Sequence, residues 1–150
     1  MTYCPSMRGF DPDTGNSIGY LLRDTSRRVL RDMTVRLEPH GLTLPQYFVL
    51  RELWQEAGAT QRELASRVGV AEPAMVATLD ALETAGLVVR ERSTQDRRKS
   101  HAALTARGAA LRDAILSEAA SVLERGLAGV SDADIATVRR VLHRIKQNLA

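Results

Sequence analysis

The chain has 150 residues, a formal net charge of +3 and a single cysteine. This length suits one domain with an adequate core, and one cysteine excludes a disulfide framework or a cysteine zinc cluster. No run approaches the roughly eighteen apolar residues of a membrane span. Residues 1–15 lack the basic start and apolar centre of a signal peptide. We therefore expect a cytoplasmic protein whose first 15 residues form a flexible arm.

Two helices are predicted in the first third of the chain. Between residues 17 and 37, apolar residues recur at helical spacing, with several arginines on the other side. Pro39 then ends this segment. The second helix should begin at Thr43 or Leu44, because Pro45 is well tolerated in a first turn.

Two shorter helices should follow, joined by a tight turn. Thr60 and Glu63 make a T-x-x-E capping box, which predicts a helix that begins directly after Thr60. Gly69 should end it, since glycine adopts the left-handed conformation without strain. The next helix has Pro73 in its first turn and apolar residues at helical spacing up to Gly86.

A basic hairpin is predicted after these helices. Residues 87–89 and 102–104 are typical of strands, and they flank the polar stretch STQDRRKS. The segment 90–107 holds six basic and two acidic residues, a local charge of +4, so the remainder is close to neutral. Helix, turn, helix and basic hairpin is the layout of a winged helix-turn-helix, whose second helix enters the DNA major groove. We interpret the hairpin as a phosphate-binding wing.

The C-terminal segment predicts two more helices. Thr105 can cap a helix that runs to about Ala128, and Ser131 can begin another. Apolar residues of the last helix are spaced by three and four: Ile135, Val138, Leu142, Ile145 and Leu149. This seam spans only two heptads, too few for a stable coiled coil alone. With the first long helix, it should form a dimer interface that flanks the DNA-binding unit.

The ordered motifs resemble the MarR family of transcriptional regulators, and its SlyA-like branch most closely. They are TQRELASRVGV, EPAMVATLDALETAGLV, DRR at 96–98 and LTARG at 104–108. The similarity covers roughly residues 17–150. It implies a mainly α fold with a small β-hairpin wing.

Within that fold, the resemblance places the winged helix-turn-helix at about 44–104 and dimerisation helices at about 17–37 and 105–150. It further implies a homodimer on a pseudo-palindromic operator of double-stranded DNA.

The resemblance also assigns roles within the wing. Asp96 and Arg98 match the family's D-x-R motif. Asp96 would brace a neighbouring arginine by a charge-assisted hydrogen bond, while Arg98 reaches the flanking minor groove. The remaining wing residues expected to contact phosphates are Arg90, Arg92, Arg97 and Lys99.

The second short helix departs from the family pattern. Ala74 and Ala77 stand where the branch carries a polar residue and an arginine, and residues 71–89 hold no lysine or arginine. Bidentate arginine–guanine contacts are therefore absent from this helix. The side chains left for base contacts are Glu72, Pro73, Ala74, Ala77 and Thr78. Thr78 can donate or accept, Glu72 can accept from a cytosine amine, and the small apolar side chains suit thymine methyls. We expect weaker direct readout, with more affinity from the wing and from DNA shape.

A small-molecule pocket is also implied by the resemblance. Family members respond to small aromatic acids or other anionic phenolic compounds, between the dimerisation helices and the DNA-binding lobe. The matching positions are Arg23, Tyr47 and Arg51. The arginines would hold a carboxylate while Tyr47 stacks on a ring; alternatively, all three are ordinary surface and packing residues. The expected function is that of a repressor released by such a ligand.

Two other functions stay open, while catalysis has little support. The chain has no histidine pair at metal-ligand spacing, glycine-rich phosphate loop or G-x-S-x-G elbow, so we expect no enzyme, metal or cofactor. The acidic second helix suits a protein-interaction module, although the basic wing argues against one. A regulator that senses oxidants through Cys4 is the other alternative, but a mobile arm seldom lowers the pKa of a thiol.

Overall fold

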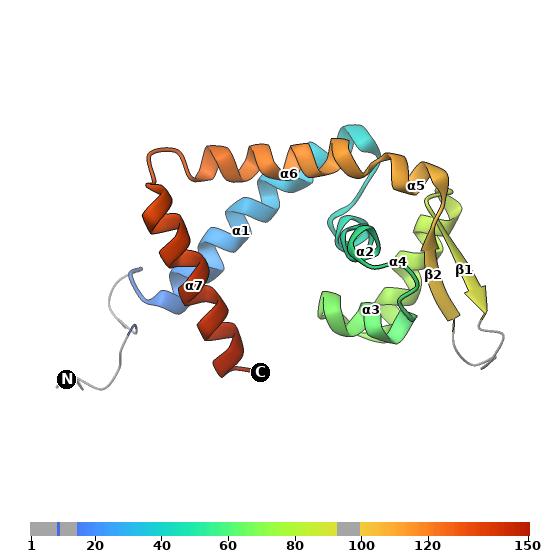
Figure 1. Cartoon of the computed structure of the whole chain (residues 1–150), viewed down its shortest axis with the longest axis horizontal. Helices are drawn as coiled ribbons and strands as arrows, with labels where there is room; N and C mark the ends of the chain where they lie inside the picture. The colour runs from blue at the N-terminus through green and yellow to red at the C-terminus, as the bar shows by residue number, and fades with distance from the viewer. Residues whose placement is uncertain (1–8, 10–14, 93–99) are drawn as a thin grey trace.

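A computed structural model describes Gly9, residues 15–92 and residues 100–150. Figure 1 shows a mainly helical chain with a two-stranded hairpin at one end, which confirms the predicted fold class. The elements are α1 (Ile18–Leu37), the 3-10 helix η1 (Glu38–His40), α2 (Leu44–Gln55), α3 (Gln61–Val68), α4 (Glu72–Thr84), β1 (Val88–Arg92), β2 (Ser100–Leu104), α5 (Ala106–Ala110), α6 (Arg112–Gly126) and α7 (Asp132–Asn148).

The helices begin where the sequence predicted, because their caps are local. The Thr60 hydroxyl accepts from the Glu63 N–H at 3.2 Å, and the Glu63 carboxylate accepts from the Thr60 N–H at 2.8 Å. Thr43 caps α2 in the same way with Gln46. Each cap satisfies backbone N–H groups that have no partner within the helix.

One predicted helix is divided in two. The sequence predicted a single helix from Thr105 to about Ala128, whereas the structure has a break at Leu111, between α5 and α6. The Trp54 indole N–H donates to the carbonyl oxygen of Gly108 at 3.0 Å. In a continuous helix that carbonyl would accept from the N–H four residues later, so the bond from Trp54 competes with the helix at this point.

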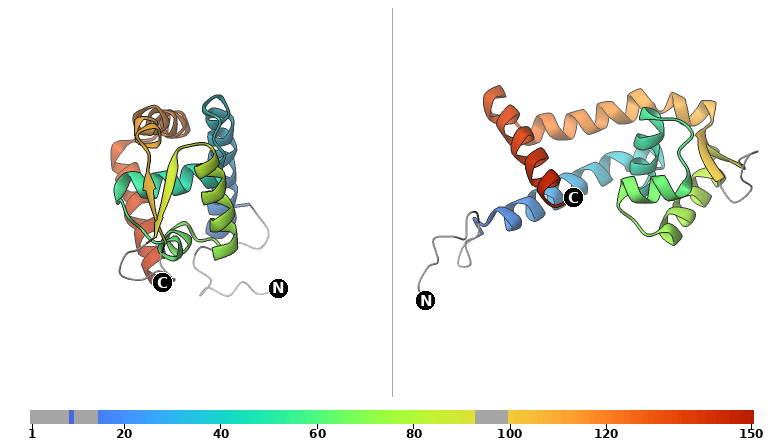
Figure 2. Two further views of the ribbon diagram at one scale, coloured as in Figure 1. Left: turned by 90° about the vertical axis from the view of Figure 1, so that its right-hand side faces the viewer. Right: turned by 60° about the horizontal axis from the view of Figure 1, so that its bottom comes forward.

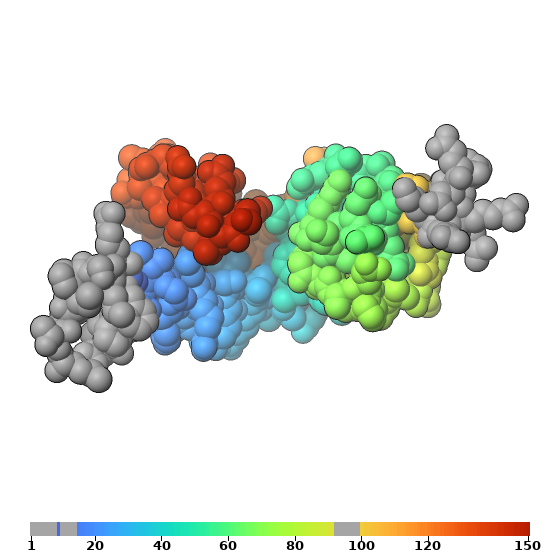
Figure 3. Space-filling view, turned by 90° about the horizontal axis from the view of Figure 1, so that it is seen from below, coloured from blue at the N-terminus to red at the C-terminus, as the bar shows by residue number. Residues whose placement is uncertain are grey.

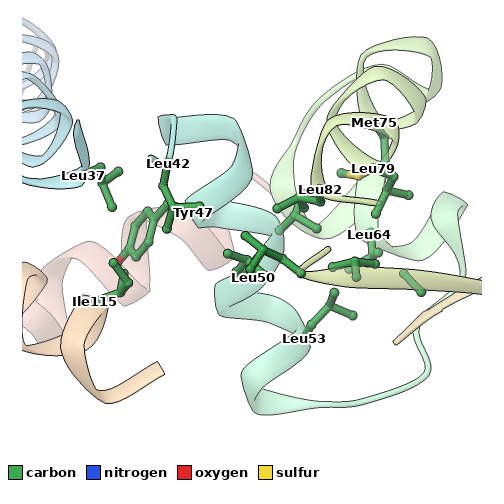
Figure 4. Close-up of a cluster of buried hydrophobic side chains, with 14 of the residues drawn as sticks. Leu37, Leu42, Tyr47, Leu50, Leu53, Leu64, Met75, Leu79, Leu82 and Ile115 are labelled. Atoms are coloured by element: carbon green, nitrogen blue, oxygen red, sulfur yellow. The ribbon is translucent and has the colours of Figure 1, made fainter. Parts of the chain in front are cut away.

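Helix α2 lies at the centre of the hydrophobic core. Figure 4 shows Leu50 of α2 near Leu64 of α3 and Leu82 of α4, while Tyr47 points toward Ile115 of α6. All five side chains are buried. The helix-turn-helix and the long helices are therefore packed against different sides of one short helix.

The long helices α1 and α6 lie side by side. Met33 of α1 and Ile115 of α6 are buried in the common core. At the edge of this contact, the Arg36 guanidinium donates to the Glu118 carboxylate at 2.9 Å, and Arg125 pairs with Asp32. The pairing with Arg36 lowers the pKa of Glu118 below its ordinary value.

The hairpin is longer than predicted and has a third, very short partner. Its antiparallel register pairs Val88 with Leu104 and Arg90 with Ala102. On the other side of β2, Thr60 forms an isolated bridge with His101. Figures 1 and 2 show the hairpin beside α4, at the end of the molecule away from α7.

The first and last helices carry exposed apolar faces. No residue of α7 is buried, and the first half of α1 is similarly open. Both lie at the end of the molecule away from the hairpin, as Figure 3 also shows. The exposed large apolar residues of the first half of α1, of α7 and of the C-cap of α7 are Ile18, Tyr20, Leu21, Leu22, Val138, Val141, Leu142 and Leu149. Among the described residues, no helix has the length and hydropathy needed to cross a membrane.

Gly108→Ala should lower the free energy of unfolding by about 1–3 kcal/mol or more, as overpacking does in cores. A Cβ at this position would overlap the backbone carbonyl oxygen of Leu87, which cannot move without displacing the hairpin. Urea unfolding monitored by circular dichroism would measure the change. Gly126→Ala is the matched control, since its Cβ meets nothing within 4 Å. Equal stability of the two variants would contradict the predicted overlap.

Candidate nucleic-acid interface

The exposed face of α4 is made of small side chains. Pro73, Ala74 and Ala77 are exposed, while Met75 and Leu79 anchor the opposite face in the core. The helical period separates the exposed face from the buried one. This face can lie close to a nucleic-acid groove, since none of these side chains holds it away.

Thr78 and Glu72, which were also predicted to contact bases, have partners within the protein. The Thr78 hydroxyl donates to the Ala74 carbonyl at 2.9 Å, so its oxygen remains as an acceptor. The Glu72 carboxylate lies 3.8 Å from the Arg62 guanidinium. Arg62 was not among the residues predicted to bind DNA. Its place in the first turn after the capping box could have indicated a cation at the start of the helix-turn-helix. Its side chain is 89% exposed beside the start of α4.

Arg90, which was predicted to contact phosphate, bonds two carboxylates of α4. Its guanidinium donates to the Glu83 carboxylate from Nε at 3.0 Å and from Nη2 at 2.7 Å, and it also bonds Asp80. Its own backbone N–H donates to Glu83 at 3.0 Å. The guanidinium is thus already held by two carboxylates of α4. The sequence could not show this, because the contact joins a strand to the preceding helix.

The charges of this cluster stabilise one another. The hydrogen bonds that Arg90 donates to Glu83 lower the pKa of Glu83 and raise the pKa of Arg90. Both groups are therefore charged at neutral pH. Asp80 and Glu83 add negative charge to α4, and Arg90 compensates part of it.

The second strand is attached to the protein on the opposite side. The Ala102 N–H donates to the Ala59 carbonyl at 3.1 Å, and the His101 Nδ1 lies 2.8 Å from the Gly58 carbonyl. At the base of the hairpin, the Thr105 hydroxyl donates to the Gly86 carbonyl at 2.7 Å. The hairpin is consequently bound to the helix-turn-helix along both edges.

The tip of the predicted wing lies outside the described residues. This applies to Asp96, Arg97, Arg98 and Lys99, and also to Cys4 near the N-terminus. Arg92 ends β1 opposite Ser100. Both strands thus lead directly into the segment that carries the remaining basic residues of the wing.

A pocket of about 210 Å³ lies between α1, α2 and α6. Of the three residues predicted for a ligand pocket, Tyr47 and Arg51 line this one, whereas Arg23 is exposed on α1 and is not among its lining residues. The sequence matched Arg23 to a family position, but only the packing of α1 decides which residues face the pocket. The lining residues are Val29, Leu30, Met33, Tyr47, Phe48, Arg51, Ala119, Val122 and Leu123.

The pocket combines apolar walls with one cation. Of its nine lining residues, Arg51 alone carries a charge. Tyr47 is only 6% exposed and packs against Phe48, with ring centroids 5.3 Å apart. Tyr47 is therefore mainly a core residue, and the half-buried Phe48 offers the more accessible ring. A cavity of about 150 Å³ can hold benzene, so this pocket has room for one substituted ring.

Together, the helix-turn-helix, the paired hairpin and the flanking helices define a winged-helix DNA-binding protein. The profile of the MarR family matches residues 42–100. The HTH-type transcriptional repressor Rv2887 of Mycobacterium tuberculosis is 42% identical over 94 residues, which are 63% of this chain and 68% of that protein. On this similarity, the chain belongs to the MarR family, whose members are transcriptional regulators rather than enzymes.

Solved structures agree over most of the chain. A MarR-family regulator from Rhodococcus sp. RHA1 superposes with a TM-score of 0.83 at 30% identity, covering 90% of this chain and 96% of that one. CouR from Rhodococcus jostii RHA1, bound to p-coumaroyl-CoA, has a TM-score of 0.79 at 31% identity, covering 87% and 92%. Rv2887 in complex with salicylic acid has a TM-score of 0.69 at 34% identity, covering 85% and 95%.

The pH dependence of stability should report the bond between Glu83 and Arg90. The pKa of Glu83 is below its ordinary value of about 4.5, so the bond stabilises the fold above that pH. This contribution is lost as the pH falls through the lowered pKa. The free energy of unfolding of the wild type should therefore fall more steeply below about pH 4.5 than that of Glu83→Gln. Urea titrations across that range would measure it, and parallel curves would contradict the assignment.

Proposed function

We propose that the chain is a homodimeric repressor of the SlyA-like branch, released from a pseudo-palindromic operator by a small aromatic anion. The observation that carries the proposal is the position of α2. One part of this helix lines the apolar pocket, and another packs against α3 and α4. A ligand in the pocket would therefore contact the helix that supports the DNA-binding unit. The repressor named among the relatives supports the same reading.

DNA contacts are divided between α4 and the wing in this proposal. The face made by Pro73, Ala74 and Ala77, with Glu72 and Thr78, would enter the major groove and contact base edges and thymine methyls. Arg98 would reach the flanking minor groove with Asp96 bracing its neighbour, and the other cations would contact phosphates. Those cations are Arg92, Arg97 and Lys99, joined by Arg62 of α3. A DNA-binding role also fits the predicted cytoplasmic location.

A second copy of the chain would cover the exposed faces of α1 and α7. The side chain of Leu142 is 42% exposed and that of Leu149 is 82% exposed. Burial of apolar surface of this kind is the main driving force of association. We therefore keep residues 17–37 and 105–150 as dimerisation segments around the winged unit at 44–104. The arm formed by residues 1–15 and any role of Cys4 stay predictions.

The proposed ligand class follows from the pocket. A ring would lie among apolar side chains near Phe48, and its carboxylate would meet the Arg51 guanidinium. Structures of similar proteins contain salicylic acid and p-coumaroyl-CoA, and both carry an aromatic ring with an acyl carbon. Arg51 replaces the predicted pair of arginines, because Arg23 does not line the pocket.

The deciding experiment is a binding isotherm on promoter DNA from the source genome, repeated over a salt series. We expect selective binding that weakens by about 0.9 log unit per log unit of salt for each phosphate neutralised. Arg98→Ala should weaken operator binding by about 1–3 kcal/mol, the size of one good groove contact.

Arg112→Ala is the control for this experiment, because it removes the same charge from the start of α6, beside Asp113. If Arg98→Ala binds the operator with unchanged affinity, the proposed contact between the wing and the DNA is wrong. Salt-sensitive binding without selectivity would indicate an architectural role. Absence of binding at every salt concentration would support the protein-interaction module instead.

Arg51→Ala should make the repressor less sensitive to salicylate, the simplest aromatic carboxylate probe. Loss of a hydrogen bond to a charged group, about 1.5–3 kcal/mol, corresponds to an increase of at least tenfold in the concentration that releases half of the DNA. Operator affinity without salicylate should stay the same, since Arg51 is exposed and outside the core. Arg23→Ala should respond like the wild type. An equal loss in both variants would contradict the assigned pocket.

A further inference from the structure

One rung of the hairpin is held from both sides. Arg90 of β1 is directly opposite Ala102 of β2. In an antiparallel pair, alternate residues turn their N–H groups away from the partner strand. Here the Arg90 N–H donates to Glu83 of α4 at 3.0 Å, and the Ala102 N–H donates to the Ala59 carbonyl at 3.1 Å. This rung therefore ties the wing to α4 on one side and to the α2–α3 connection on the other.

The hydrogen bonds between Arg90 and α4 fix the orientation of β1 relative to that helix. Glu83 accepts the Arg90 backbone N–H through Oε1 and the guanidinium through Oε2. Asp80, one helical turn earlier, bonds the same guanidinium. A planar guanidinium that bonds two carboxylates fixes both a distance and an orientation. The Arg90 side chain is only 25% exposed, so water screens this cluster less than a free surface pair.

The two carboxylates are unfavourable for DNA binding by themselves. They lie in the C-terminal half of α4, where the helix dipole disfavours negative charge. They also place negative charge on the helix that is proposed to enter the major groove, between two negatively charged phosphate backbones. A lysine or arginine is absent from the whole of α4, so Arg90 supplies compensation from outside the helix. The two carboxylates would favour DNA binding overall if their bonds to Arg90 of β1 increase the affinity more than their repulsion of the DNA lowers it.

We propose that Arg90 is a positioning residue for DNA binding, with Glu83 and Asp80 as its partners. It holds β1 against α4, so that the wing and the major-groove helix reach one duplex together, and it does not itself contact DNA. This inference rests on the proposed function. The positioning role and a phosphate-contact role predict opposite changes in operator affinity when the Glu83 charge is removed.

Glu83→Gln separates the two roles. If Arg90 contacted phosphate, removal of the Glu83 charge would free its guanidinium and reduce repulsion, so operator binding would tighten. As a positioning pair, loss of the carboxylate should weaken operator binding by about tenfold to a hundredfold, the scale of a charged hydrogen bond. Glu91→Gln is the matched control: it removes an exposed carboxylate from the next position of the same strand, and should leave binding unchanged or slightly tighter.

Arg90→Lys gives a second, independent comparison. Lysine keeps the positive charge and binds phosphates as a point charge, but it cannot bond Glu83 through two nitrogens. A positioning role predicts weaker operator binding for Arg90→Lys, close to that of Arg90→Ala. A phosphate-contact role predicts that Arg90→Lys binds nearly like the wild type. Thermal unfolding of each variant would establish that the fold is intact.

Hydroxyl-radical footprinting at saturating protein would measure the pattern of DNA protection, which does not depend on the global stability of the variant. We expect Glu83→Gln to lose protection at the outer flanks of the operator, where the wing would contact DNA, while the central protection persists. Tighter binding of Glu83→Gln, or an unchanged flank footprint, would overturn the inference while leaving the proposed function intact. A wild type that binds no DNA selectively would overturn both.

Discussion

The packing of α2 is the constraint on which the rest of the structure depends. Leu50 and Leu53 are almost completely buried in the part of the core shared with α3 and α4, and Tyr47 is buried beside α6. Burial of one such side chain is worth about 1.5–3 kcal/mol, and this short helix supplies four buried residues to the core. Because cores are close-packed, a change on one side of α2 is transmitted to the other. The pocket and the helix-turn-helix therefore share one packed helix.

The small net charge of the chain hides a separation between acidic residues on α4 and basic residues on the wing. The acidic residues of α4 first suggested a helix unsuited to DNA, since Asp80 and Glu83 lie on the same element as the predicted base contacts. Their bonds to Arg90 change that interpretation: they are structural acceptors for the adjacent strand. The outer face keeps small side chains, and positive charge is supplied by the wing and by Arg62. In the proposed function, affinity and base recognition are therefore assigned to different elements, as is common in DNA-binding proteins.

Features that depend on neighbouring residues were predictable. The capping box at Thr60, the left-handed Gly69 and the proline in the first turn of α4 all act within one or two turns. The boundaries of the helix-turn-helix followed from them, whereas the apolar residues at 87–89 and 102–104 predicted two strands that proved longer. Matching to the family pattern named Arg23, Tyr47 and Arg51 for a ligand pocket, and the pocket between α1, α2 and α6 is lined by the last two. The break at Leu111 was missed, because its cause is Trp54, more than fifty positions away along the chain.

By itself, the sequence determined the order of helices and strands, the family, and the concentration of positive charge on the wing. These depend on local periodicity, caps and composition, which need no knowledge of distant contacts. Only the tertiary structure decided what individual side chains do. It assigned Arg90 to α4, removed Arg23 from the pocket and made Phe48 its accessible ring. These contacts depend on which helix faces pack together. The helical period shows which residues share a face, but it does not show which element packs against that face.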